Sequence, residues 1–210
     1  MLPVLACAAL VAGCLVAMRR GSELGVWLTK PLASAAFVWA AFAWGAPASP
    51  FGRWLVLGLA ACALGDVLLI PRSAPRAFRA GMLAFGVGHA LFAAAFLSRG
   101  VSVTATVLAL AGASAFTAGV WRWLRPHLGR DDRIPVLLYV GVIALMLGCA
   151  IGAVARGAPW AAGAGALLFA LSDLAVAQDR FVAPSFTSTL WGLPAYYAAQ
   201  LLLAFGAAGG

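Results

Sequence analysis

The chain contains very few acidic residues. Only six of its 210 residues are Asp or Glu, and all charged residues together make up 10% of the sequence, against about 25% in soluble domains. Hydrophobic residues account for 64%, and the mean hydropathy is +1.01. This composition excludes an ordinary soluble domain and indicates an integral membrane protein.

Histidine is also scarce, because His89 and His127 are the only two in the chain. A zinc site built from three histidines is therefore excluded. The four cysteines lie singly in apolar runs without CxxC spacing, which is typical of small buried side chains. P-loop, GxSxG and HExxH motifs are absent as well. The sequence predicts neither a metal nor a cofactor.

The net charge of +8 does not indicate a nucleic-acid partner. The basic residues are spread over many short polar segments, and no basic domain is present that could follow a phosphate backbone. Arginines at the ends of apolar runs instead set the orientation of membrane spans. We expect no nucleic-acid binding and expect contact with membrane lipids.

Apolar runs of the length of a membrane span dominate the chain. A spanning helix needs about 20 largely apolar residues. The first run continues to Arg19-Arg20 and has no basic residue before it, so we expect a retained helix rather than a cleaved signal peptide. The sequence predicts an all-α, polytopic bundle of eight transmembrane helices in a single integral-membrane domain, residues 1–210, with spans at about 2–18, 25–44, 54–70, 80–98, 101–123, 134–155, 159–178 and 187–206.

The arginines are unequally divided between the two sides of the predicted bundle. Three lie in even-numbered loops, and ten lie in odd-numbered loops: Arg19, Arg20, Arg72, Arg76, Arg79, Arg122, Arg125, Arg130, Arg133 and Arg180. The positive-inside rule then places both termini outside the cytoplasm. We expect a multi-pass protein of a bacterial inner membrane.

Two carboxylates lie within the apolar runs, at Asp66 and Asp173. A charged residue at membrane depth costs about 2.5–3.5 kcal/mol on insertion scales, so such a residue is a candidate for function. Both lie in the predicted cytoplasmic half, near the ends of the third and seventh spans. Asp66 precedes His89 by 23 residues, and Asp173 precedes Tyr196 by the same number. This match predicts a parallel repeat of four helices plus four.

A few other polar side chains accompany the carboxylates. Lys30 is open to two interpretations: it snorkels to the interface, or it binds a phosphate or neutralises an aspartate. His89 is expected either to bond to a nearby carbonyl or to contact a carboxyl group. Tyrosines at span ends usually face the interface, but these lie further inside their spans. The predicted supporting residues are Lys30, His89, Tyr139, Tyr196, Tyr197 and Gln200.

These residues, in this order, resemble the lysoplasmalogenase (YhhN-like) family of membrane proteins. The matching stretches are Lys30–Leu32, Leu64–Leu69, Phe85–His89, Tyr139 with Met146, Gly165–Asp173 and Tyr196–Gln200. The resemblance implies a protein with eight spans that hydrolyses the vinyl ether bond of lysoplasmalogens. The products would be a fatty aldehyde and glycerophosphocholine or glycerophosphoethanolamine.

Paired carboxyl groups suit this chemistry. A vinyl ether is cleaved by protonation of its β-carbon, which requires an acid that is still protonated near neutral pH. Burial beside a second carboxylate favours the protonated form of one group. We therefore expect Asp66 and Asp173 to act as general acid and base, in either order. Lys30, with Arg72 or Arg76 at the mouth, would hold the lipid phosphate, and Phe85 and Phe92 would line the chain site.

Two other functions compete with hydrolysis. A small proton-coupled transporter would use intramembrane Asp and His as a relay, although no helix is obviously broken near the midplane. A structural role in a larger complex would pair the aspartates with Lys30 or an arginine. In that case a Lys30→Asp, Asp66→Lys exchange would keep function.

Overall fold

The computed structural model describes residues 1–71 and 74–209, and within them the chain is helical, without a β-strand. The long helices are α1 (Leu2–Arg19), α2 (Glu23–Ala43), α3 (Pro50–Leu68), α4 (Pro75–Ser98), α5 (Val103–Leu124), α6 (Arg130–Val154), α7 (Trp160–Ala177) and α8 (Phe186–Ala208). Two short 3₁₀ turns, η1 (Ala46–Ala48) and η2 (Arg125–His127), and one π-helical turn, η3 (Gln178–Val182), complete the list. The predicted all-α bundle of eight helices is confirmed.

Seven of these helices are long and apolar enough to cross a membrane. The helix outside this group is α8, although it has 23 residues. Its hydropathy is lowered by Tyr196, Tyr197 and Gln200, all of which are buried inside the bundle. These three side chains thus face other helices instead of lipid, as expected for a helix that carries part of a site.

Several helices begin earlier than their apolar runs. Pro50 and Pro75 each occupy the first turn of a helix, where proline needs no hydrogen-bond partner for its nitrogen. The hydroxyl of Ser49 accepts a hydrogen bond from the Gly52 amide at 3.0 Å and so caps α3. These polar first turns extend the helices beyond the apolar stretch that the sequence pattern detects.

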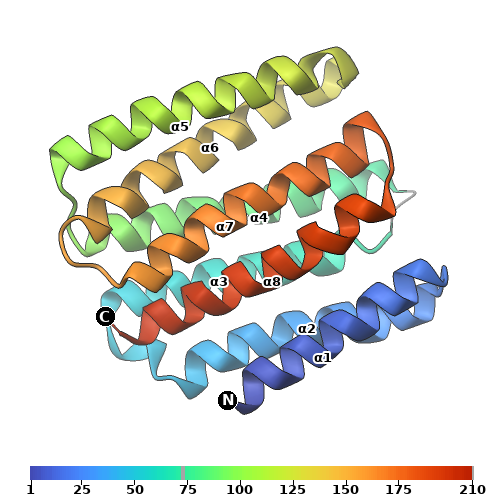
Figure 1. Ribbon diagram of the computed structural model, residues 1–210, viewed down its shortest axis with the longest axis horizontal. Coiled ribbons are helices and arrows are strands. Elements are labelled where there is room, and N and C mark those ends of the chain that lie inside the picture. Colours follow the sequence, from blue (N-terminus) through green and yellow to red (C-terminus); the bar gives the residue numbers. More distant parts are fainter. Residues whose placement is uncertain (72–73, 210) are drawn as a thin grey trace.

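The eight long helices pack in pairs that are consecutive in the sequence (Figure 1). The α1–α2 and α5–α6 pairs lie on opposite sides of a central group formed by α3, α4, α7 and α8, and both termini lie at the same end of the bundle. Helices α3 and α4 form one central hairpin, and α7 and α8 form the other. The two halves therefore use the same order of hairpins, while the four-plus-four repeat stays a prediction.

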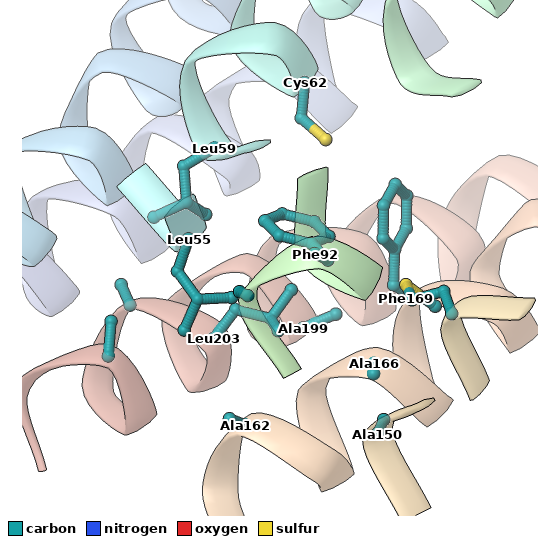
Figure 2. Close-up of a cluster of buried hydrophobic side chains, with 14 of the residues drawn as sticks. Leu55, Leu59, Cys62, Phe92, Ala150, Ala162, Ala166, Phe169, Ala199 and Leu203 are labelled. Carbon is teal, nitrogen blue, oxygen red and sulfur yellow. The ribbon is translucent and has the colours of Figure 1, made fainter. Parts of the chain in front are cut away.

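Small residues allow the central helices to approach closely. Figure 2 shows Ala162, Ala166 and Ala199 beside the larger Leu203 and Phe169 in the buried core. A Cβ added at Gly165 would lie 2.8 Å from the Ala199 carbonyl oxygen and 2.9 Å from the Leu203 nitrogen. Because both are backbone atoms, α7 and α8 cannot accommodate the added methyl group without moving apart.

Gly165→Ala is therefore expected to destabilise the protein, by about 1–3 kcal/mol, the usual range for overpacking. Gly141 on α6 is the matched control, because a Cβ added there meets no atom within 4 Å. Gly141→Ala should be neutral or stabilising by up to about 1 kcal/mol. Thermal unfolding of the two variants in detergent checks this, and equal melting temperatures would contradict the close packing of α7 on α8.

Candidate active site

The two intramembrane carboxylates line one cavity. The cavity has a volume of about 450 Å³, and Asp66 of α3 and Asp173 of α7 both contribute to its wall. It reaches from these carboxylates to the end of the bundle at which α3 and α7 terminate, where Pro71 and Arg180 line it. Most of the lining is apolar, and the charged side chains among its described residues are Lys30, Asp66, Asp173, Asp179 and Arg180.

Asp66 is held by an ion pair and by hydroxyl donors. The Lys30 ammonium lies 3.1 Å from Asp66 Oδ1 and donates to the Asp66 backbone carbonyl at 3.1 Å. Tyr196 donates to Oδ2 at 2.6 Å, and Ser34 donates to the same oxygen at 2.7 Å. All these groups are donors, and Asp66 is only 2% exposed. The Asp66 carboxylate therefore accepts from an ammonium group and two hydroxyl groups within the bundle.

Lys30 is buried in this ion pair, with 6% of its surface exposed. The interpretation that it snorkels to the interface is therefore wrong. The ammonium group can satisfy its donors on Asp66 from within the bundle, so it has no need to reach water. Lys30 also lines the cavity, which leaves it within reach of a bound lipid.

Ser34 is a site residue that the sequence interpretation missed. It lies one turn after Lys30 on α2 and so shares a face with it. Its oxygen is 3.1 Å from the Tyr197 hydroxyl, which lies 3.2 Å from the Lys30 carbonyl. Tyr197 thus supports Asp66 through Ser34 without contacting the carboxylate. The one usable signal was the spacing of four residues from the buried lysine.

Asp173 has a different set of neighbours. Tyr139 donates to Asp173 Oδ2 at 3.0 Å, and His89 Nε2 lies 3.3 Å from the same oxygen. The Asp173 side chain is 15% exposed, compared with 3% for that of Asp66. Asp173 is therefore the more open of the two carboxyl groups toward the cavity.

His89 connects a backbone carbonyl to Asp173. Its Nδ1 lies 2.9 Å from the Phe85 carbonyl oxygen, which can only accept, so Nδ1 carries a proton. Nε2 faces Asp173 at 3.3 Å without the alignment of a regular hydrogen bond. A neutral imidazole would present a lone pair to the carboxyl oxygen, and two lone pairs repel. A proton held between His89 and Asp173 removes that repulsion.

The two carboxylates are bound according to the same scheme. Each contacts the preceding helix, Asp66 through Lys30 and Ser34 of α2 and Asp173 through Tyr139 of α6. Each also contacts one residue in the other half of the chain, namely the residue 23 positions after the other aspartate. Asp66 meets Tyr196 of α8, and Asp173 meets His89 of α4. The equal spacing of 23 residues in the sequence therefore corresponds to crossed partners in the structure.

An aromatic layer joins the two sides of the site. The Phe169 ring lies 4.1 Å from the His89 ring and 5.6 Å from the Tyr196 ring, between centroids. Phe85 contacts Tyr196 at 5.7 Å and lines the cavity. Phe92, expected to line the chain site, is instead fully buried in the core, where it packs against Phe169. Phe85 and Tyr196 thus form part of the cavity wall, and Phe169 packs against both rings.

Gln200 belongs to neither set of carboxylate contacts. It is fully buried, is not part of the cavity wall, and neither end of its amide has a hydrogen-bond partner among the described residues. The structure does not bring it into contact with either aspartate. Of the predicted supporting residues, Lys30, His89, Tyr139 and Tyr196 contact a carboxylate, Tyr197 acts through Ser34, and Gln200 stands apart.

The structure tests one of the two arginines predicted to bind phosphate at the mouth. Arg72 lies outside the described residues, and Arg76 is exposed and absent from the described cavity wall. Arg76 lies on the exposed side of the first turn of α4, whereas Phe78 of the same turn lines the cavity. Arg180, assigned from the sequence only to a charged loop, lines the cavity instead.

Comparison with known proteins agrees with the sequence motifs. The model of the YhhN family matches residues 25–207. The chain is 35% identical to lysoplasmalogenase TMEM86A of Bos taurus over 164 residues, which are 75% of this chain and 66% of that protein. It is 35% identical to the lysoplasmalogenase of Mycobacterium bovis over 200 residues, which are 89% of this chain and 73% of that protein.

A human relative gives a similar result. The chain is 33% identical to lysoplasmalogenase TMEM86B of Homo sapiens over 178 residues, covering 84% of this chain and 71% of that protein. The match to the bovine protein spans just under two thirds of its length. No solved structure matches the chain significantly. Together with its membrane-spanning helices, these relatives identify a multi-pass integral membrane protein.

Proposed function

Because this chain belongs to the YhhN family, we propose that it hydrolyses the vinyl ether bond of lysoplasmalogens. The products would be a fatty aldehyde and glycerophosphocholine or glycerophosphoethanolamine. The observation that supports this most is that two carboxyl groups with unlike partners line one cavity. One accepts from an ammonium group and two hydroxyl groups and the other adjoins a histidine, so the two carboxyl groups are suited to different roles in acid–base catalysis.

We assign the proton donor to Asp173. Its contact with His89 is relieved by a shared proton, and its side chain is partly open to the cavity. Tyr139 holds the carboxyl group in place through the 3.0 Å hydrogen bond. A carboxylic acid in this position can deliver a proton to the β-carbon of a vinyl ether, the step that produces an oxocarbenium ion.

Asp66 then acts as the fixed negative charge. Its ion pair with Lys30 and its two hydroxyl donors keep it ionised while the substrate is bound. A preorganised carboxylate in a water-poor cavity stabilises a developing cation more strongly than water does. The division into one neutral and one ionised carboxyl group is the arrangement found at glycosidic bonds.

The proton balance closes over the cycle. Asp173 gives its proton to the β-carbon, and the oxocarbenium ion forms at the α-carbon. Water adds to that carbon, and Asp173 takes the released proton back with the support of His89. The hemiacetal then breaks its bond to the glycerol oxygen, its hydroxyl proton moves to that oxygen, and aldehyde and alcohol leave. No net proton is consumed.

The cavity also suits a lipid with a single chain. Phe116 and Val120 of α5 and Val140 and Ile143 of α6 give it an apolar side wall, and the polar groups lie toward the helix ends. An alkenyl chain would lie along this wall while the head group remains at the mouth. We place the mouth on the cytoplasmic side of a bacterial inner membrane, with both termini outside the cytoplasm, from the distribution of arginines.

A substrate panel tests this function. The purified protein is incubated with lysoplasmalogen and, separately, with diacyl, lysoacyl and two-chain plasmalogen lipids, and the released aldehyde is measured. We expect aldehyde from lysoplasmalogen alone, because the acyl esters contain no vinyl ether and a second chain needs a second groove. Transport is not favoured, since α2 and α8 run unbroken past their polar residues. The absence of aldehyde from every lipid would contradict the proposal.

A further inference from the structure

We infer that Arg180 binds the phosphate group of the substrate lipid and thereby sets the position of the vinyl ether against Asp173. The inference rests on the proposed function and adds the residue that recognises the head group. Arg180 belongs to the π-helical turn η3, which continues α7 beyond Ala177 at the mouth of the cavity. A guanidinium group has the planar donor geometry that suits phosphate oxygens.

Aromatic packing orients the guanidinium group. The Arg180 Cζ atom lies 4.3 Å from the centroid of the Phe78 ring, which also lines the cavity. Phe78 is held in turn by an edge-on contact with Phe181, at 5.6 Å between centroids. Stacking on an aromatic face leaves the in-plane N–H donors directed sideways, so a phosphate can be bound without loss of the stacking.

The charges around the cavity favour this position for an anion. Lys30 and Arg180 are the cationic side chains among the described residues of its wall. The Lys30 charge is balanced by Asp66 at 3.1 Å, deep in the bundle. The neighbouring Asp179 carboxylate accepts the Ser185 amide at 2.9 Å and so anchors the turn to the start of α8. Because Arg180 belongs to the turn at the mouth and Lys30 lies deeper beside Asp66, a phosphate that enters the cavity would meet Arg180 before Lys30.

The distances along the chain and along the lipid agree. Asp173 and Arg180 are seven residues apart, which is about 10 Å along a helix axis at 1.5 Å per residue. Seven bonds separate the phosphorus from the β-carbon of the vinyl ether. They span about 8 Å when extended, at the roughly 1.2 Å per bond of an extended peptide chain. A hydrogen bond at each end makes up the difference, so one lipid can contact both residues at once.

The test compares two vinyl ethers that differ only in the phosphate: lysoplasmalogen and 1-O-alkenylglycerol. Arg180→Gln should raise KM for lysoplasmalogen about 10-fold or more, the loss typical of a charge-assisted hydrogen bond, with little change in kcat. For alkenylglycerol it should change kcat/KM less than about 3-fold. Arg180→Lys keeps the charge but loses the fork geometry and should fall between Gln and wild type.

Arg99→Gln is the matched control, because Arg99 stacks on Phe51 at 5.7 Å at the opposite end of the bundle. It should leave both substrates unaffected. An unchanged KM of Arg180→Gln for lysoplasmalogen would overturn the inference while the proposed function stands. An equal loss on both substrates would also overturn it, since that result marks a structural role. A wild-type protein inactive on both substrates would instead refute the proposed function.

Discussion

Asp173→Asn is expected to lower kcat for aldehyde release by about 10²–10⁴-fold, the range associated with loss of a general acid. Asparagine has nearly the same shape and can still accept the hydrogen bond from Tyr139. It cannot hold an acidic proton, so the β-carbon of the vinyl ether is no longer protonated. Initial rates of aldehyde formation at saturating lysoplasmalogen measure the effect.

Two comparisons separate chemistry from folding in this experiment. Asp131→Asn changes a carboxylate that is 82% exposed in its side chain and should retain full activity. The melting temperature of Asp173→Asn in detergent should remain close to that of the wild type, because the hydrogen bond with Tyr139 persists. If Asp173→Asn keeps more than about a tenth of the wild-type kcat, Asp173 is not the proton donor.

Breaking the ion pair between Lys30 and Asp66 is expected to have the second large effect, on stability as well as on activity. Lys30→Met leaves a buried carboxylate without its cation, and removal of one partner of a buried pair costs about 3–5 kcal/mol. Asp66→Asn leaves the buried ammonium alone and should be destabilised similarly. The double variant Lys30→Met, Asp66→Asn should be more stable than either single one, because neither charge remains buried.

Activity should not follow stability in this series. The double variant regains stability but lacks the fixed negative charge, so it should release no aldehyde. The exchange Lys30→Asp, Asp66→Lys keeps an ion pair yet moves the carboxylate to α2, away from Tyr196. Melting temperatures and rates of aldehyde formation are measured on the same samples. Full activity of the exchanged pair would mean that Asp66 and Lys30 have only a structural role.

The helices could be predicted because the apolar length of a span and the arginines at its ends can be read from a short stretch of sequence. Each predicted span corresponds to one observed helix, and the third, fourth and sixth begin earlier than predicted because their first turns are polar. The π-helical turn at Gln178–Val182 was not predicted. Its residues are polar and lie between two apolar runs, which resembles an ordinary loop in sequence.

The members of the site were easier to predict than their pairing. A carboxylate, a lysine or a histidine within an apolar run is conspicuous because burial of an isolated charge is costly. Which group contacts which depends on helix packing across more than 100 residues, as between Asp66 and Tyr196. For this reason the sequence left the acid and the base in either order, and the proposal that Asp173 is the acid rests on its contact with His89 in the structure.

Ser34 and Arg180 could not be recognised from the sequence, although both line or contact the candidate site in the structure. A serine in an apolar helix usually bonds to a carbonyl of the preceding turn, and the Ser34 oxygen also lies 3.1 Å from the Lys30 carbonyl oxygen, so its sequence context carries no sign of function. An arginine after a span usually marks orientation alone. Both residues gained a place in the site only through the position of their helices around the cavity.

The route of bond cleavage is tested most directly by isotope labelling of both products. The purified protein converts lysoplasmalogen in ¹⁸O-labelled D₂O, the aldehyde is trapped at once by reduction, and both products are analysed by mass spectrometry. Protonation at the β-carbon followed by attack of water at the α-carbon predicts one deuterium on the carbon beside the former carbonyl and no ¹⁸O in the glycerophospho-base. Detection of ¹⁸O in the glycerophospho-base would mean that water attacks the glycerol carbon, and would contradict the role assigned to Asp173 and Asp66.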